Sequence, residues 1–290
     1  MENIKLILKS STYYPKSLLT LKQPPEFLLA IGNIDLLNTF SIGIVGARAC
    51  TTQSILLTKQ LVNELCNRNI TILSGMADGI DCIAHETCIE AHGKTIAVIG
   101  SGFDIAEKRR IFSNILDNDG LILSEYFPDI PAFPYNFPRR NQILVSLAKS
   151  IIAVEIHIKS GTMITAEEAL KQRVPLFTFP GDIYDKKYHG NNLLLTRGAF
   201  CINSYLDIID KLKKIYPTQN FSSTHSSTPH IKIPTEFQKI YAIIEEAPQD
   251  INTIARKFNL PLKNLQSQLT LMELENIIYK RQNIYYIYNK

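Results

Sequence analysis

Short apolar runs alternate with helical patterns along most of this chain, and this alternation restricts the fold more than any other feature. Residues 41–46 (SIGIVG), 70–75 (ITILSG) and 95–100 (TIAVIG) have the length and apolarity of buried strands. The stretches between them, 52–68 and 80–92, have the length and pattern of helices. Further strands are expected at 121–124, 151–155 and 175–179, and further helices at 105–117, 138–149 and 162–172. The alternation predicts an α/β fold of Rossmann-like, doubly wound type with a mostly parallel sheet.

Composition limits the class of protein. The chain has 290 residues, of which 45% are hydrophobic, so disorder along the whole length is excluded. No apolar run approaches the roughly 20 residues that a bilayer requires, and the first residues lack a secretory signal. We therefore expect a cytoplasmic protein with no membrane partner. The net charge of +4 permits a nucleic-acid partner without arguing for one.

A segment rich in Ser, Thr and Pro divides the chain. Residues 217–230 (PTQNFSSTHSSTPH) carry one large apolar side chain and are expected to be a linker. We expect an N-terminal lead-in at 1–40 that packs on the core domain, a Rossmann-like domain at 41–216 and a separate C-terminal domain at 231–290.

The C-terminal domain has a helix-turn-helix pattern. Helices are expected at 235–246, 251–258 and 262–275, with a turn at 259–261, and two strands are expected at 277–281 and 284–288. This succession predicts a winged-helix domain, which usually binds duplex DNA. The candidate recognition helix is poor in basic residues, however. A role in protein interaction or packing is therefore at least as well supported as DNA reading.

Glycine-rich loops follow three successive strands. They are residues 46–48 (GAR), 74–81 (SGMADGID) and 100–104 (GSGFD). In parallel sheets, ligands bind at the carboxyl ends of the strands, and loops of this kind can approach phosphate groups. A site for a phosphate-bearing ligand is favoured over three unrelated tight turns.

A second segment favours a nucleic-acid groove. Phe137, Arg139 and Arg140 follow a stretch that also holds Tyr126, Phe127, Phe133 and Tyr135. Aromatic and guanidinium groups can stack on bases, and guanidinium groups bind phosphate. The alternative is a surface loop whose arginines pair with carboxylates.

Other motifs argue against cofactors and metals. The triplet Gly93–Thr95 resembles the end of a phosphate-binding P-loop, but Cys88 stands where that motif begins with glycine. Ile105 breaks the dinucleotide-binding pattern that Gly100 begins. The five cysteines form no C-x-x-C pair, so neither zinc nor a disulfide framework is expected. Asp81 and His85 share a helix face, and a structural role is favoured over acid–base chemistry.

Several ordered motifs carry a family resemblance. They are IVGARACT (44–51), ILSGMADGIDCIAH (72–85), GKTIAVIGSGFD (93–104), LILSEYFPD (121–129), NFPRRNQILVSLAKSIIAVE (136–155), KSGTMITAEEAL (159–170) and PGDIYDKKYHGNNLLLTRGA (180–199). From residue 14 to about residue 212, the chain resembles the DNA-processing protein A family, DprA or Smf.

The resemblance implies a non-enzymatic protein that binds single-stranded DNA. Family members protect incoming DNA in natural transformation, load the RecA recombinase and act as homodimers without nucleotide hydrolysis. Arg48 matches the basic residue of the family's G-[ST]-R loop, while 139–141 and 159–162 match its FPRRN and KSG-[ST] segments. Together with the glycine loops, the residues expected to contact DNA are Gly46, Arg48, Ser74, Gly75, Gly79, Gly100, Lys108, Phe137, Arg139, Arg140, Asn141, Lys159, Ser160, Gly161 and Thr162.

Two departures from the family pattern bear on DNA affinity. Ala47 replaces the usual Ser or Thr, and Asp78 replaces a basic residue, so a phosphate attractor becomes a repeller. Lys108, Arg109 and Arg110 are candidates to restore the missing positive charge.

Two functions of other classes remain open. One is a nucleotide N-glycosidic hydrolase, for which Glu167 is the nearest carboxylate, although it lies five residues after Thr162 where three are usual. The other is a duplex-binding regulator that uses the C-terminal domain.

Overall fold

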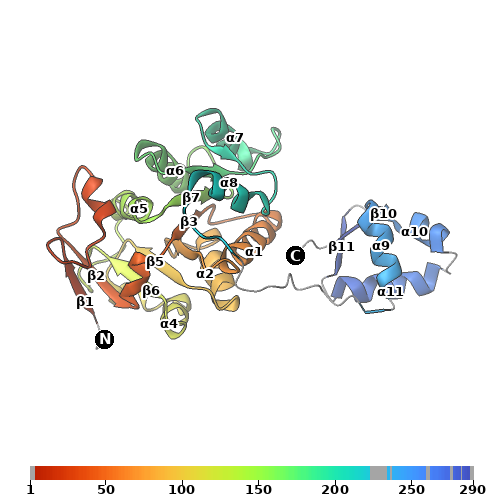
Figure 1. Cartoon of the computed structure of the whole chain (residues 1–290), viewed down its shortest axis with the longest axis horizontal. Coiled ribbons are helices and arrows are strands. Elements are labelled where there is room, and N and C mark those ends of the chain that lie inside the picture. Colours follow the sequence, from red (N-terminus) through yellow and green to blue (C-terminus); the bar gives the residue numbers. More distant parts are fainter. Residues whose placement is uncertain are drawn as a thin grey trace. The chain divides into compact units, whose positions relative to one another are not determined.

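The structure is a computed structural model that describes residues 4–222, 234–235, 237–258, 262–274, 277–281 and 283–287. The chain divides into two compact units, Met1–Thr224 and His225–Lys290, shown in Figure 1. Each unit has its own hydrophobic core.

The first unit is built on a sheet in the order β1-β2-β6-β5-β4-β3-β7-β8-β9. From β6 to β9 all neighbouring strands pair in parallel. The parallel strands are β3 (Ser41–Val45), β4 (Thr71–Ser74), β5 (Thr95–Ile99), β6 (Leu121–Ser124), β7 (Ser150–Ala153), β8 (Leu176–Thr178) and β9 (Phe200–Cys201). The predicted α/β fold with a mostly parallel sheet is confirmed.

The first 40 residues contribute two strands that the sequence pattern did not predict. β1 (Lys5–Leu8) pairs antiparallel with β2 (Phe27–Gly32), and β2 pairs antiparallel with β6. A short 3-10 helix follows each of these strands in the sequence: η1 (Lys16–Thr20) after β1 and η2 (Ile34–Asn38) after β2. The segment therefore extends the sheet.

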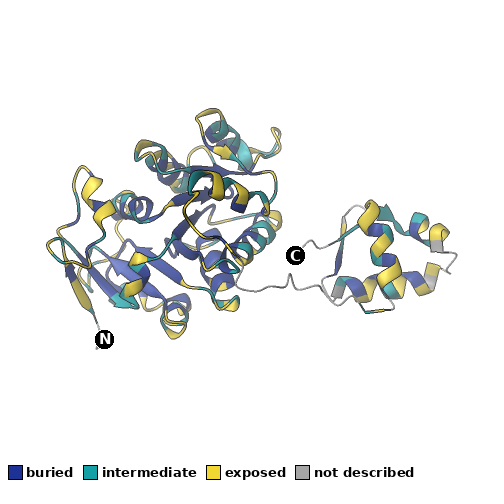
Figure 2. Cartoon of the chain, in the orientation of Figure 1, coloured by how far each residue is buried: buried dark blue, intermediate teal, exposed yellow. Residues whose placement is uncertain are grey.

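Helices cover both faces of this sheet, as Figure 1 shows. One face packs against α1 (Thr52–Cys66), α2 (Ile80–Glu90), α3 (Phe103–Ala106), α4 (Arg110–Asp117) and α8 (Asp207–Ile215). The other face packs against α5 (Asn136–Leu147), α6 (Gly161–Lys171) and α7 (His189–Thr196). In β5, for example, Ile96 and Val98 point to the second face, and Ala97 and Ile99 to the first. Figure 2 shows the buried strands between helices whose outer sides are exposed.

The region predicted as one helix at 105–117 forms two. The backbone turns between α3 and α4, where the Arg109 amide donates to the carbonyl of Ala106. This turn directs the Arg109 side chain to the loop after β4, where it donates to the carbonyl oxygen of Met76. The predicted helix is thus divided at the residue whose side chain contacts the loop after β4.

The end of the first unit includes part of the segment expected to be a linker. Phe221 is buried and packs edge-to-face on Phe40, with ring centroids 5.3 Å apart. Residues 223–230 of that segment lie outside the described residues.

The described residues of the second unit form three helices and a small sheet. Its elements are α9 (Gln238–Glu246), β10 (Gln249–Asp250), α10 (Ile251–Phe258), α11 (Leu262–Leu274), β11 (Ile278–Arg281) and β12 (Ile284–Ile287), with the strands in the order β10-β12-β11. Asp250 caps α10 by accepting the amides of Asn252 and Thr253. Ile240, Ile254 and Leu265 lie in the core of the unit. The predicted turn at 259–261 lies outside the described residues.

Candidate functional site

The strand order places a crevice beside β3. After β3 the chain runs through β4, β5 and β6 on one side and then returns to form β7 on the other side. Ligands of open α/β sheets bind outside the carboxyl ends of the strands at such a reversal. A cavity of about 470 Å³ lies there, lined by residues 46–49 after β3 and by His157 and residues 160–162 after β7. We refer to it as the larger cavity.

A second cavity adjoins the first. The smaller cavity, of about 280 Å³, is lined by residues that follow β4 and β5, including Gly75 and Gly100. Arg48, Phe137 and Arg140 line both cavities. The loops after four neighbouring strands thus form one continuous site.

Arg48 is the exposed cation at the junction of the two cavities. Its guanidinium carbon lies 5.8 Å from the centroid of the Phe137 ring. Gly79 shapes the loop that carries it, because a Cβ atom there would stand 2.3 Å from the carbonyl oxygens of Ala47 and Arg48, and its φ is +78°. The amide of Ile80 also donates to the Ala47 oxygen at 3.2 Å. The loop after β3 is therefore held against the start of α2, with the Arg48 side chain free to turn toward a ligand.

The loop after β7 presents the N-terminus of α6 to the larger cavity. The Ser160 hydroxyl caps this helix by accepting the amide of Met163 at 3.2 Å. Within the described residues, the amides of Gly161 and Thr162 have no acceptor, and a Cβ atom on Gly161 would meet nothing within 4 Å. The Thr162 hydroxyl donates to the Gly46 carbonyl at 2.8 Å and ties this loop to the one after β3. Unpaired amides at a helix N-terminus favour an anion.

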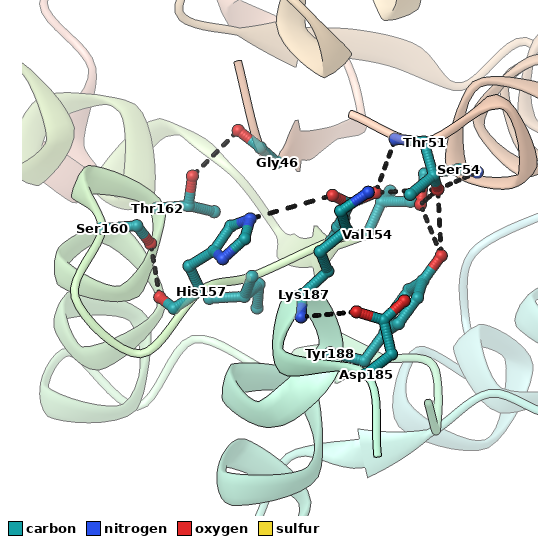
Figure 3. A network of polar contacts seen from close by, with 12 residues as sticks. Gly46, Thr51, Ser54, Val154, His157, Ser160, Thr162, Asp185, Lys187 and Tyr188 are labelled. Atoms are coloured by element: carbon teal, nitrogen blue, oxygen red, sulfur yellow. Dashed lines mark hydrogen bonds and ion pairs between the residues drawn. The ribbon is translucent and has the colours of Figure 1, made fainter. Parts of the chain in front are cut away.

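A network of polar contacts connects the segment after β3 with the segment after β7, and Figure 3 shows Thr51, Ser54, His157 and Tyr188 within it. Glu155 is fully buried, and its Oε2 accepts both the amide and the hydroxyl of Thr51, each at 2.9 Å. Tyr188 donates or accepts at the hydroxyls of Thr51 and Ser54. Glu155 Oε1 has no hydrogen-bond partner among the described residues, and His157 Nε2 lies 4.0 Å from it. Glu155 therefore fixes the start of α1 and lies near His157, which lines the cavity.

The two arginines of the FPRRN segment are turned into the protein. Arg139 forms a bidentate pair with Glu125, at 2.6 and 2.7 Å, which is the alternative that the sequence left open. Arg140 is buried and donates to the carbonyl oxygens of Gly75 and Val98. Both guanidinium groups thus have protein partners in this structure, and their contact with phosphate stays a prediction. Asn141, also buried, accepts from Arg140 at 2.9 Å.

Four further residues expected to contact DNA also pack against other parts of the protein. The Ser74 hydroxyl is buried and donates to the Ile44 carbonyl at 2.6 Å. Gly75 makes room for Arg140, whose guanidinium would lie 2.4 Å from a Cβ atom there. Gly46 likewise makes room for Ile80, and Gly100 packs beneath Phe137. Gly46 nevertheless lines the larger cavity, and Gly75 and Gly100 line the smaller one, so their contact with DNA stays a prediction.

Asp81 and His85 are both buried. Burial raises the pKa of Asp81, while Arg140 and the amide of Gly75 oppose this effect. Burial, with Arg109 and Arg140, lowers the pKa of His85 to about 3, and His85 Nδ1 lies 2.7 Å from the Thr95 hydroxyl. These contacts agree with the structural role that the sequence analysis favoured.

Asp78 does not stand as an isolated repeller. It pairs with Arg109 at 2.5 Å on the rim of the smaller cavity. The positive charge of Arg109 therefore neutralises the negative charge of Asp78. Lys108 and Lys159 are exposed but line neither cavity.

Sequence reasoning did not single out Glu155 or His157. Glu155 directly follows the apolar run 151–154, so a carboxylate at the carboxyl end of a predicted strand was the available signal. The burial of that carboxylate and its contact with Thr51 depend on pairing between β3 and β7, which lie far apart in the chain.

The hydrolase alternative is not supported by the position of Glu167. This residue pairs with Arg197 at 2.7 Å and lines neither cavity. Among the described residues, no group of three or more His, Cys, Asp or Glu side chains could hold a metal ion. No helix in the described part of the chain is long and apolar enough to cross a membrane.

Comparison with known proteins supports the family resemblance. Residues 5–213 match the family described as DNA recombination-mediator protein A. Protein Smf of Escherichia coli is 30% identical over 94% of this chain and 74% of its own length. DNA processing protein DprA of Streptococcus pneumoniae is 36% identical over 68% of this chain and 70% of its own length.

Two solved structures share the fold. One is DprA from Streptococcus pneumoniae, with a TM-score of 0.68 and 32% identity over 72% of this chain and 75% of that one. The other is DNA processing protein A from Helicobacter pylori, which binds single-stranded DNA, with a TM-score of 0.66 and 31% identity over 74% of this chain and 98% of that one. The chain belongs to the DNA recombination-mediator protein A family.

Proposed function

We propose that this chain binds single-stranded DNA at the two adjoining cavities, protects incoming DNA in natural transformation, and loads the RecA recombinase onto it. The observation that carries the proposal is Arg48, an exposed guanidinium beside an aromatic ring where the two cavities meet. A phosphate bound there would also face the unpaired amides of Gly161 and Thr162. The relative from Helicobacter pylori binds the same kind of nucleic acid.

The site is suited to binding without catalysis. The residues that could serve as acid and base, Asp81 and His85, are buried: Asp81 accepts the amide of Gly75 after β4, and His85 bonds the Thr95 hydroxyl at the start of β5. We therefore propose a cytoplasmic recombination mediator that acts as a homodimer and hydrolyses no nucleotide. We also propose that residues 231–290 form a winged-helix module.

Fluorescence anisotropy with a labelled single strand and the matching duplex, at several salt concentrations, tests the proposal. We expect preference for the single strand and affinity that falls with salt. Arg48→Ala should weaken binding and reduce the slope of log K against log salt by about 0.7, the contribution of one phosphate contact in single strands. Binding with an unchanged slope would remove Arg48 from the site.

Arg197→Ala is the matched control. Arg197 is an exposed arginine that lines neither cavity, so its loss should leave the salt slope unchanged. Preference for duplex, lost on removing residues 231–290, would instead support the duplex-binding regulator. Release of free base from nucleoside monophosphates would support the hydrolase.

A further inference from the structure

Two aromatic side chains beside the site are exposed and stacked on each other. The rings of Phe133 and Tyr135 lie with centroids 5.2 Å apart and planes 10° from parallel. Tyr135 is 71% exposed and Phe133 is 40% exposed. Neither ring belongs to a hydrophobic core cluster, and neither lines a cavity described above. The fold therefore gives no reason for this pair.

Hydrogen bonds hold the backbone segment that carries the two rings, and they do so without a ligand. Asn136, which is buried, donates from its side chain to the carbonyls of Gly100 at 3.0 Å and Pro131 at 3.2 Å. Its amide donates to the Phe133 carbonyl at 3.0 Å. Pro134, which lies between Phe133 and Tyr135 in the sequence, restricts the backbone further. A ligand that stacks on Tyr135 would meet a preorganised surface, so little conformational entropy would be lost on binding.

The aromatic pair is continuous with the candidate site. Ala132, one residue before the pair, lines the smaller cavity, and Phe137, two residues after Tyr135, lines both cavities. Arg48 faces the ring of Phe137. If a phosphate of single-stranded DNA lies at Arg48, the neighbouring nucleotides would therefore lie beside the segment that carries the two rings.

The chemistry of the pair favours a nucleobase. Two parallel rings already form a stack, and the open face of the more exposed ring can continue it with another flat π-system. Stacking of this kind does not depend on base identity, as sequence-independent binding requires. We propose that Tyr135, supported by Phe133, stacks a base of the single strand whose backbone is held at Arg48. This inference rests on the proposed function and assigns to it a contact with the bases.

The absence of tryptophan from the chain permits a direct test. Tyr135→Trp places one tryptophan at the proposed contact and retains a ring for stacking. We expect its fluorescence to be quenched by oligo-dT, but not by an abasic oligonucleotide of the same length. Anisotropy of labelled versions of both should show that both bind. Binding of oligo-dT without quenching would overturn the inference.

Affinity measurements give a second test. Tyr135→Ala should weaken oligo-dT binding by about 5- to 150-fold, the range for loss of one base–aromatic stack, whereas Tyr135→Phe should bind like the wild type. Tyr184→Ala is the control, because Tyr184 is 88% exposed and lines neither cavity. Wild-type affinity in Tyr135→Ala would overturn the base contact and leave the proposed function intact.

Two other outcomes would also be decisive. If the wild-type chain binds no single strand, both the proposed function and the inference fail. If the fluorescence of Tyr135→Trp changes with protein concentration in the absence of DNA, and oligo-dT causes no further change, the rings belong to an interface between copies of the chain, and the base contact is refuted.

Discussion

Arg140 provides the sharpest test of the roles that the structure assigns within the FPRRN segment. β4 ends at Ser74, whose register partner in β5 is Ala97, whereas β5 continues to Ile99. The guanidinium of Arg140 donates to the carbonyls of Gly75 and Val98, just beyond the last paired residues. Arg140→Met keeps a long side chain but removes the Nη1 group that donates to both carbonyls. We expect this variant to be destabilised, with any effect on DNA binding secondary to that loss.

The size of the effect follows from the two carbonyl groups. A buried polar group that loses its partner costs about 1–3 kcal/mol. Because Arg140 borders both cavities, water can partly replace it, and we expect a total loss near the lower end, about 3 kcal/mol. In a domain of this size, 1 kcal/mol lowers the melting temperature by about 2–4 °C, so the expected shift is about 6–12 °C.

Thermal and urea unfolding of Arg140→Met measure this loss, with Arg48→Met as the exposed control. The loss of stability in Arg140→Met should become smaller as the pH falls through the folded-state pKa of Asp81. Burial raises the pKa of Asp81, so its ionised form opposes folding at neutral pH, and Arg140 offsets that cost. Without Arg140 the cost is larger, but protonation of Asp81 removes it as the pH falls. A variant with wild-type stability and impaired DNA binding would refute the structural role and restore Arg140 as a DNA contact.

Two further substitutions test the architecture around the site. His85→Gln should make stability less sensitive to acid. The pKa of His85 is about 3 in the folded protein and ordinarily 6.5, so wild-type stability should fall by up to about 1.4 kcal/mol per pH unit below about pH 6.5. Urea midpoints measured across this range would show whether the variant lacks that dependence. Gly79→Ala should weaken single-strand binding and stability together, because a Cβ atom would collide with the carbonyl oxygens of Ala47 and Arg48 at a φ of +78°; an unaltered melting temperature and affinity would contradict this reasoning.

The parallel part of the fold could be predicted because its strands are buried on both faces. Continuous apolar runs such as 41–46 and 95–100 are strong signals, and the helices between them have regular lengths. β1 and β9 lie at the edges of the sheet and are only four and two residues long, and β2, which was also missed, lies between β1 and β6. Their strand character comes from pairing with distant segments, and the local pattern did not reveal it.

The location of the site could also be predicted, because it depends on topology. Loops that follow neighbouring parallel strands must meet at one edge of the sheet, and the loops at 46–48, 74–81 and 100–104 do so. The particular part played by each glycine could not be predicted. Gly75 admits the guanidinium of Arg140, while Gly161 borders open space. The residue type is the same, and only the packing around it separates the two roles.

The same reasoning explains why residue type alone could not distinguish the surroundings of the three arginines. Arg48, Arg139 and Arg140 are equally able to bind phosphate, and all three lie in segments that resemble the family pattern. Glu125 engages Arg139, and the carbonyl groups beyond the paired ends of β4 and β5 engage Arg140. Arg48 has no ion pair within the described part of the chain, and its guanidinium remains exposed. A cation whose charge is not already matched by the protein gains the most from an incoming phosphate, so affinity should depend on Arg48 and stability on Arg140.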